Sequence, residues 1–299
     1  MKINFLRIRG EIMRIYKYEA FTDKASMGNP AGVVFGCDNL TEDEMQKTAE
    51  KAGFNETVFL LESKEADVKM RYFTPGHEMN LCGHATIAGV KAIYEKNNKK
   101  IKTVETLSGI INIDMEIQKT GKIFISMEQL PAQFEEFHGD RKKLSEVMGL
   151  SEEDIDGSLP VMYGSTGIWT LLVPVKELSA FLRMKPDNKK FPEVLFQKPK
   201  ASLHPFCLET YDKNADMHGR HFSSPFSGTV EDPVTGTASG VMGAYYIKYI
   251  KPADEKNIII EQGQEIGKNG IVYVNVKKEC ESLNVKIKGE AVSAGEIFI

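Results

Sequence analysis

Apolar and polar positions alternate along this chain in short runs, a pattern that predicts many strands separated by a few helices. Residues 14–21 alternate and are rich in aromatic side chains, as expected for a half-buried strand. An apolar run resumes at 33–35, after a turn-rich segment at 26–32. Further strands are expected at 56–61, 68–73, 103–107, 110–117, 122–127, 169–173, 202–209, 258–261, 271–276, 282–288 and 296–299.

Helices are expected where the spacing of apolar residues changes from that of a strand to that of a helix. Thr41-Glu42-Asp43-Glu44 forms a capping box, which predicts a helix running to about Gly53. Short helices are expected at 140–148 and 175–182. Two further helices, at 85–95 and 236–249, are built of small and apolar residues on most faces. Because such a helix has no solvent face, we expect both to be enclosed by other elements.

The starts of these two enclosed helices resemble each other. Residues 80–89 can be laid over residues 233–242, so that glycine, alanine and small hydroxyl residues coincide: Cys82 with Thr235, Gly83 with Gly236, Ala85 with Ala238 and Thr86 with Ser239. An internal duplication explains this match and predicts two similar domains. Pro131 and the acidic, loop-like stretch after it place the end of the first domain near residue 130.

Length and charge agree with two folded domains. The 299 residues carry a formal charge of −4, and such a balance argues against a dedicated nucleic-acid-binding protein. Four cysteines are scattered without a CxxC pair, so neither a disulfide framework nor a structural zinc site is expected. No apolar run reaches the length of a membrane span, and charged residues interrupt the first segment, which excludes a signal peptide. We therefore expect a cytoplasmic protein that does not contact membranes, with residues 1–12 as an extension before the first domain.

The duplicated helix starts are candidate anion sites. The first N–H groups of a helix have no partner within it and carry the positive end of its dipole, and glycine lets a ligand approach them closely. A single small-residue helix start would be explained by tight packing alone, but two copies in register favour a pair of sites for a carboxylate or phosphate. Gly83, Gly236 and Thr237 are the residues concerned.

Several ionisable side chains flank these helix starts. Glu56 begins an apolar strand, and burial there would raise its pKa toward the range of a general base, although a solvated strand-end glutamate would follow the same pattern. His84 can transfer a proton or donate a hydrogen bond. Asp232 precedes Pro233 and suits either a catalytic role or a simple turn. Cys82 is either a reactive thiol or a small buried residue.

Other motifs are missing or weak. The sequence contains no GxGxxG, GxxxxGK[ST], GxSxG or HExxH motif and so gives no reason to expect a nucleotide, serine-hydrolase or zincin site. His218 and His221 have the i, i+3 spacing of metal ligands, but no third ligand lies nearby in sequence. We interpret them as surface or strand residues and expect no metal site.

From residue 13 onward the chain resembles the phenazine-biosynthesis PhzF-like family of isomerases. The similarity lies in seven blocks in the same order: residues 28–34, 55–59, 71–75 with Glu78, 82–86, 220–222, 231–240, and 262–263 with Gly267. The resemblance implies an α+β fold like that of diaminopimelate epimerase, with two pseudo-symmetric domains, each a mixed β-barrel wrapped around a central helix. The first domain would comprise 13–130, completed by the C-terminal strand 290–299, and the second 131–289, with the site between them.

The resemblance also implies roles for individual residues. In the family's phenazine isomerase, a glutamate at the position of Glu56 moves a proton on dihydro-hydroxyanthranilate. The family's histidine and aspartate correspond to His84 and Asp232, while backbone groups at Gly83 and at Gly236–Thr237 hold the carboxylate. No cofactor is implied, and a homodimer is expected.

This sequence departs from the family at two places. Asn55 stands where serine is common, a change expected to affect contacts with the substrate. Cys82 stands where epimerases of this fold keep one catalytic thiol, but Thr235 replaces the other. A shift of a proton by one carboxylate is therefore a better fit than a racemisation by two thiols.

The sequence thus predicts a cofactor-independent isomerase of a small carboxylic acid, with Glu56 as base and acid, His84 and Asp232 assisting, and Asn55, Cys82, Gly83, Gly236 and Thr237 binding the substrate. Two alternatives stay open at this point. One is an amino-acid epimerase or racemase that uses Cys82, and the other is a non-catalytic protein that binds a small acid.

Overall fold

The computed structural model describes residues 7–8 and 11–299, and the chain divides into two compact units. Unit 1 comprises residues 1–127 and 289–299, and unit 2 comprises residues 128–288. The sequence placed the boundaries at 130/131 and 289/290. The expected extension at 1–12 lies largely outside the described residues, except for a short antiparallel pair, β1 (Arg7–Ile8) and β2 (Glu11–Ile12).

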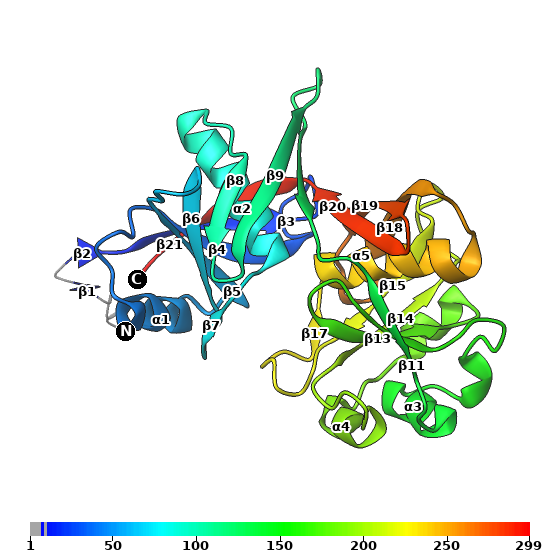
Figure 1. Cartoon of the computed structure of the whole chain (residues 1–299). Coiled ribbons are helices and arrows are strands. Elements are labelled where there is room, and N and C mark those ends of the chain that lie inside the picture. The colour runs from blue at the N-terminus through cyan, green and yellow to red at the C-terminus, as the bar shows by residue number, and fades with distance from the viewer. Residues whose placement is uncertain (1–6, 9–10) are drawn as a thin grey trace. The chain divides into compact units, whose positions relative to one another are not determined.

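Unit 1 is a mixed sheet around one helix (Figure 1). Its elements are β3 (Arg14–Ala20), β4 (Asn29–Val34), α1 (Glu42–Ala52), β5 (Glu56–Leu61), β6 (Val68–Phe73), β7 (Glu78–Met79), α2 (Gly83–Asn97), β8 (Thr103–Thr106), β9 (Gly109–Ile117), β10 (Ile123–Glu128) and β21 (Ala291–Phe298). The strands lie in the order β21–β3–β4–β5–β6–β8–β9–β10, with β7 beside β6. The strand at the C-terminus thus lies beside the first strand of this sheet.

Unit 2 contains more helical connections. Its strands are β11 (Gln133–Glu136), β12 (Met162–Ser165), β13 (Trp169–Pro174), β14 (Ser202–Cys207), β15 (Met217–Gly219), β16 (His221–Phe222), β17 (Glu231–Asp232), β18 (Glu255–Gln262), β19 (Gly270–Glu279) and β20 (Ser282–Gly289). Its helices are α3 (Arg141–Met148), η1 (Glu152–Asp154), η2 (Leu178–Arg183), η3 (Asn188–Lys190), α4 (Phe191–Val194), α5 (Gly236–Tyr245), η4 (Tyr246–Ile250) and η5 (Gln264–Ile266).

The two units repeat one strand pattern. In unit 2 the order is β11–β12–β13–β14–β15–β18–β19–β20. Only the third and fifth neighbouring pairs in each list are parallel: β4–β5 and β6–β8 in unit 1, and β13–β14 and β15–β18 in unit 2. In each unit a two-residue strand, β7 or β17, precedes the enclosed helix. The expected α+β fold of two pseudo-symmetric halves is therefore confirmed, and the repeat extends well beyond the matching sequence.

Each sheet curves around its own helix. Helix α2 packs against β3, β4, β5 and β21, and α5 packs against β12, β18 and β19. In unit 2, backbone bonds from Gln129 and Ala132 to β20 bring the segment before β11 back beside the last strand, which closes the sheet around α5. A Cβ at Gly243 of α5 would lie 2.7 Å from the Val274 side chain, so glycine is what permits this close packing.

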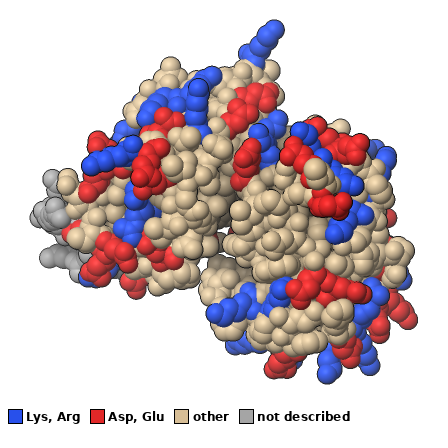
Figure 2. All heavy atoms as spheres, viewed as in Figure 1, with Lys and Arg blue, Asp and Glu red and all other residues tan. Residues whose placement is uncertain are grey.

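Local sequence signals located several elements correctly. The capping box at Thr41 and Glu44 is present, and α1 ends at Gly53 in the left-handed conformation. Strands β5 and β6 have the expected bounds. Among the described residues, no helix combines the length and apolar character needed to cross a bilayer. Figure 2 shows basic and acidic side chains interspersed on the face in view, as the small net charge suggests.

Four sequence-based assignments need correction. Strand β4 begins at Asn29, inside the segment expected to be a turn, because residues 29–33 pair with β3. The stretch after Pro131 contains strand β11, which is short and mostly exposed and therefore lacks an apolar pattern. The helix expected at 175–182 is the 3₁₀-helix η2 at Leu178–Arg183. The helix expected at 236–249 is α-helical only to Tyr245 and continues as a π-helix.

Candidate active site

Three predicted site residues of unit 1 meet at the start of α2. Glu56 is the first residue of β5, Cys82 is the N-cap residue of α2, and His84 is the second residue of that helix. The Nε2 atom of His84 lies 3.1 Å from Oε2 of Glu56. The Cys82 sulfur lies 3.4 Å from Nδ1 and 3.9 Å from Nε2 of the same ring. The fold thus brings an acid, an imidazole and a thiol together from two separate elements.

Asn29 completes this cluster, and the sequence analysis missed it as a site residue. Its side-chain Nδ2 lies 3.3 Å from Nδ1 of His84. When the ring is neutral, the Asn29 amide donates to Nδ1 and leaves the Nε2 proton directed at Glu56. When the ring is charged, the same amide can turn and accept from Nδ1–H. Asn29 can therefore support both protonation states of His84. The feature that could have identified Asn29 from the sequence is its place beside Pro30 in the first block that is similar to the family.

The backbone around Asn29 is held closely. The N–H of Gly28 donates to Oε2 of the fully buried Glu19 at 3.0 Å. A Cβ at Gly28 would lie 2.3 Å from the carbonyl oxygen of Ala20, so only glycine fits there. Ala20 in turn pairs with Asn29 across β3 and β4. These contacts fix the position of the Asn29 side chain relative to α2.

The first turn of α2 is fixed by the carbonyl of its own N-cap residue. That carbonyl of Cys82 accepts from the Thr86 backbone N–H at 2.9 Å and from the Thr86 hydroxyl at 2.7 Å, and the hydroxyl also lies 2.7 Å from the Tyr72 hydroxyl. The Cys82 side chain makes no capping bond. The leading amides of α2, at Gly83 and after it, are thus not capped by their N-cap side chain, as an anion site requires.

Burial and neighbouring groups shift the pKa of His84 in opposite directions. Burial by itself lowers the pKa of His84, but its contacts with the neighbouring Cys82 and Glu56 side chains outweigh burial, so this pKa is raised well above its usual value. Burial raises the pKa of the Cys82 thiol. Because such a thiol stays protonated at neutral pH, Cys82 faces the imidazole as a neutral group. The cluster can accept, hold and return a proton, whereas a reactive thiolate is disfavoured.

Unit 2 has a corresponding helix start around Asp232. The Thr235 hydroxyl donates to Oδ2 of Asp232 at 2.5 Å, and the Thr235 N–H donates to Oε1 of Gln262 at 3.2 Å. The Gln262 amide donates to the Asp232 carbonyl at 2.7 Å. Thr235 is the N-cap residue of α5, and Gly236 and Thr237 form its first turn without a side-chain cap. Asp232, Gly236 and Thr237 thus cluster at this helix start, as the sequence grouped them.

The two helix starts differ in the chemistry that they carry. Phe73 pairs with Thr57 in unit 1 and Phe222 pairs with Leu203 in unit 2, so Glu56 corresponds to Ser202. Ser202 is buried and donates its hydroxyl proton to Thr170. The helix alignment makes Thr237 the counterpart of His84. Unit 2 therefore lacks both the carboxylate and the imidazole of the unit 1 cluster.

Each helix start also follows an arginine–glutamate pair that sequence reasoning overlooked. Arg71 binds Glu78 through two bonds of 2.6 Å, and Arg220 binds Glu231 through bonds of 2.8 and 2.6 Å. Both glutamates stand five positions before the first residue of the enclosed helix. Each arginine also lies over the phenylalanine two residues later. Extending the repeat upstream along the sequence would have found these pairs.

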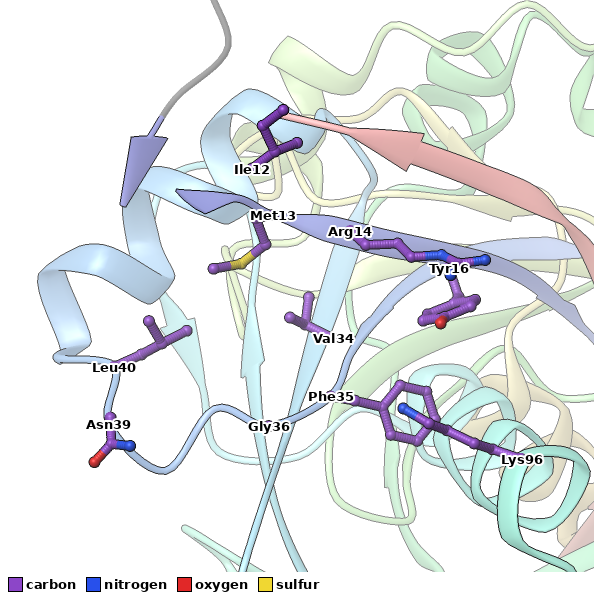
Figure 3. Close-up of a pocket in the computed structure, with 10 residues that line it drawn as sticks. All are labelled: Ile12, Met13, Arg14, Tyr16, Val34, Phe35, Gly36, Asn39, Leu40 and Lys96. Atoms are coloured by element: carbon purple, nitrogen blue, oxygen red, sulfur yellow. The ribbon is translucent and has the colours of Figure 1, made fainter. Parts of the chain in front are cut away.

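Unit 1 also contains Asn55, a predicted substrate-binding residue, and a separate pocket. Asn55 occupies the bend just before β5 and is partly buried. A pocket of about 460 Å³ lies elsewhere and contains none of the predicted site residues (Figure 3). In it the Lys96 ammonium lies 3.9 Å from the centre of the Phe35 ring, and the Arg14 side chain extends past Tyr16. We assign no catalytic role to this pocket.

His218 is a buried strand residue. Its Nδ1 lies 3.0 Å from Glu261 Oε1 and its Nε2 lies 3.1 Å from Glu265 Oε1. The rings of Phe181 and Tyr211 pack against its edges. Of the two interpretations of His218, surface or strand residue, the structure supports the strand, because β15 is enclosed between β14 and β18.

Replacing His218 with glutamine is expected to lower stability in a pH-dependent way. Burial lowers the pKa of His218, but hydrogen bonds and charge from Glu261 and Glu265 overcome burial and raise it above its usual value. The charged form therefore adds stability in full below pH ~6.5, and this contribution fades as pH rises through the folded-state pKa. Tyr211 and the Arg220 charge near Glu265 also face this group.

Urea unfolding of the wild type and of His218→Gln between pH 5.5 and 9 measures this effect. The difference in unfolding free energy should be largest at the acid end and shrink toward pH 9. A difference that grows with pH would contradict the assignment of a charged His218.

Comparison with known proteins places these features in a family. The chain matches the family described as phenazine biosynthesis-like protein (PhzC-PhzF) over residues 18–296. It is 53% identical over 281 residues to the uncharacterized isomerase YfhB of Bacillus subtilis, covering 93% of this chain and 95% of that protein. The crystal structure of the Bacillus anthracis phenazine biosynthesis protein of the PhzF family superposes with a TM-score of 0.94 at 51% identity, covering 97% and 99% of the two chains.

A more distant relative has a named substrate. It is the trans-2,3-dihydro-3-hydroxyanthranilate isomerase of Pseudomonas aeruginosa, which is 26% identical over 286 residues, covering 94% of this chain and 98% of that protein. The match along nearly the whole chain, the superposition and the repeated strand order agree. The chain belongs to the phenazine biosynthesis-like family of isomerases.

Proposed function

We propose that this isomerase moves a proton between two carbon atoms of a small carboxylic acid, with Glu56 as the only base and acid and without a cofactor. Glu56 takes the proton from one carbon as a carboxylate and returns it at another as a carboxylic acid. The charged or neutral imidazole of His84 steadies each state of the carboxyl group.

The observation that supports this proposal is the asymmetry between the two helix starts. A carboxylate lies 3.1 Å from an imidazole at α2, whereas Ser202 and Thr237 occupy the corresponding positions of unit 2. Racemisation by a symmetric pair of bases would need a second acid–base group at the matching place. A single carboxylate that both takes and returns the proton needs none.

The relative from Pseudomonas aeruginosa suggests the substrate class. Its name identifies trans-2,3-dihydro-3-hydroxyanthranilate, a cyclic acid in which a proton shift between carbons is an isomerisation. We propose a substrate of this type, a ring or chain that carries a carboxylate next to a carbon acid. The partly exposed side chain of Glu56, at 17%, allows such a molecule to reach the base.

The other predicted residues are assigned binding and orienting roles in this proposal. The amides at Gly83, Gly236 and Thr237 bind the carboxylate, since neither helix start is capped by its N-cap side chain. Such fixed dipoles would also stabilise the carbanion-like transition state. Asp232 orients the substrate, and Asn55 and Cys82 line its binding site. The homodimer and the cytoplasmic location inferred from the sequence stay predictions.

Turnover in D₂O tests the proton transfer. The purified chain is incubated with trans-2,3-dihydro-3-hydroxyanthranilate in D₂O, and the product is examined by mass spectrometry and NMR. We expect deuterium at the carbon that gains the proton, because the partly exposed Glu56 carboxyl group can exchange with solvent while the intermediate persists. A reaction without enzyme serves as the control.

The outcomes separate the parts of the proposal. A product formed with no deuterium above natural abundance would contradict transfer through an exchangeable carboxyl group. An unchanged compound at high enzyme concentration would exclude this particular acid as substrate. Prolonged incubation with an acid that raises the melting temperature but is recovered unchanged and without deuterium would favour the binding-protein alternative.

A further inference from the structure

The cluster at the start of α2 also has the composition of a metal site. A carboxylate oxygen of Glu56, the sulfur of Cys82 and a ring nitrogen of His84 all lie within 4.8 Å of one another. Carboxylate, thiolate and imidazole are the three ligand types that zinc takes in proteins. The sequence analysis predicted no metal site here, because Glu56 is remote from Cys82 and His84 along the chain.

The distances between these atoms suit one shared ion. With Zn–N and Zn–O near 2.0–2.2 Å and Zn–S near 2.3 Å, tetrahedral ligand atoms stand roughly 3.4–3.6 Å apart. The observed separations are 3.1 Å between His84 Nε2 and Glu56 Oε2, and 3.9 Å between the Cys82 sulfur and His84 Nε2. The Cys82 sulfur lies nearer to Nδ1, at 3.4 Å, so its side chain must rotate toward Nε2 for all three atoms, which lie within 4.8 Å of one another, to bond one cation.

The surroundings favour a bound ion with one open position. Cys82 and His84 are buried and stand on the first turn of a helix, while Glu56 stands at the head of a strand, so the ligands are held by rigid elements. The remaining ring nitrogen of His84 faces the Asn29 amide, which can turn its oxygen to accept the Nδ1 proton, as outer partners of metal-bound histidines do. Since Glu56 is partly exposed, the fourth ligand position opens on its side.

The cluster of His218, Glu261 and Glu265 cannot hold one ion between its three side chains. His218 directs its two ring nitrogens at two different glutamates, Glu261 and Glu265. One ion cannot bind both sides of a ring and both carboxylates. Within residues 7–8 and 11–299, Glu56, Cys82 and His84 form the group of possible metal ligands whose atoms all lie within 4.8 Å of one another.

We propose that Glu56, Cys82 and His84 bind a thiophilic divalent cation, Zn²⁺ above all, and that the bound ion inhibits the isomerase. On binding, the Cys82 thiol loses its proton to solvent and the sulfur bonds to the ion, with no change in oxidation state. Inhibition rests on the proposed function, because the ion takes the carboxylate that acts as base. Binding itself does not depend on it.

Titration of the metal-free, full-length chain with Co²⁺ tests the binding. Cobalt replaces zinc in tetrahedral sites and has a thiolate-to-cobalt charge-transfer band in the near ultraviolet. We expect this band to saturate at one equivalent and to disappear when Zn²⁺ is added in competition. Cys82→Ser should abolish the band, while the matched change at an exposed cysteine, Cys280→Ser, should leave it unchanged.

Two further variants test the other ligands. His84→Gln and Glu56→Gln should each weaken Co²⁺ binding at least about tenfold, the loss that even the outer partners of a metal site produce. Circular dichroism of each variant checks that it is folded. The absence of a charge-transfer band in the wild type, or the same band in folded Cys82→Ser, would overturn the proposed site.

Inhibition is measured separately from binding. Deuterium incorporation into the product should fall in proportion to the fraction of chains that hold Zn²⁺ and return when a chelator is added. If Zn²⁺ binds at the cluster and incorporation continues, the inhibitory role is wrong and the metal site remains. If Co²⁺ binds as expected but no acid is isomerised, the proposed function fails and the site stands.

Discussion

Glu56→Gln is expected to reduce turnover by about 10²- to 10⁴-fold, the usual contribution of a positioned general base. The amide keeps the size of the side chain and its place 3.1 Å from His84, but it cannot take a proton from carbon. The loss should therefore appear in kcat, with substrate binding largely kept. Steady-state kinetics on the isomerised acid measure it, and an unchanged melting temperature shows that the fold is intact. A variant that retains wild-type kcat would remove Glu56 from the mechanism.

Cys82→Ala tests whether the thiol takes part in catalysis. If the enzyme used the thiol as an epimerase does, this change would be as severe as Glu56→Gln. Burial raises the pKa of Cys82 and keeps the thiol protonated, so we expect a much smaller loss. Equal losses in the two variants would favour the epimerase alternative.

Arg220→Met is expected to destabilise unit 2 by about 3–5 kcal/mol, because it leaves a buried partner without its opposite charge. The Arg220 and Glu231 side chains are only 7% and 11% exposed, and the guanidinium also donates to the carbonyl of Phe181 at 2.7 Å. Methionine keeps much of the volume but none of these bonds. Urea unfolding followed by the fluorescence of Trp169, the single tryptophan, reports on unit 2 directly.

Arg183→Met is the matched control in the same unit. Arg183 pairs with Asp154 at 2.6 Å, but its side chain is 53% exposed, so its loss should cost at most about 1 kcal/mol. The contrast between the two arginines tests burial rather than the count of ion pairs. Equal midpoints for Arg220→Met and the wild type would contradict a structural role for the Arg220–Glu231 pair.

Local patterns were sufficient for most elements. The capping box before α1, the apolar runs of β5 and β6 and the small-residue starts of α2 and α5 are signals of neighbouring residues, and these elements have the expected starts or lie within two residues of them. The short strands β11 and β17 were missed, because a partly exposed strand of two to four residues needs no apolar alternation. The register that pairs β4 with both β3 and β5 likewise could not be predicted from the turn-rich residues at its start.

The candidate site was likewise predictable from the sequence only in part. Glu56, His84 and Cys82 were candidates by residue type and resemblance, but their meeting depends on the register of β5, since a slip of one residue would turn Glu56 to the other face. Asn29 emerged only from the structure, because its contact with His84 joins positions far apart in the chain. The same holds for the ion pairs of His218, a residue that the sequence placed only on the surface or on a strand.

The sequence by itself determined the family, the duplication and the residue types available for proton transfer, because these are properties of short segments in order. Only the tertiary structure decided that the carboxylate, imidazole and thiol converge in one unit while the other unit holds serine and threonine at the matching places. The physical reason is that side-chain distances of 3–4 Å are set by strand register and helix packing, which no local pattern encodes.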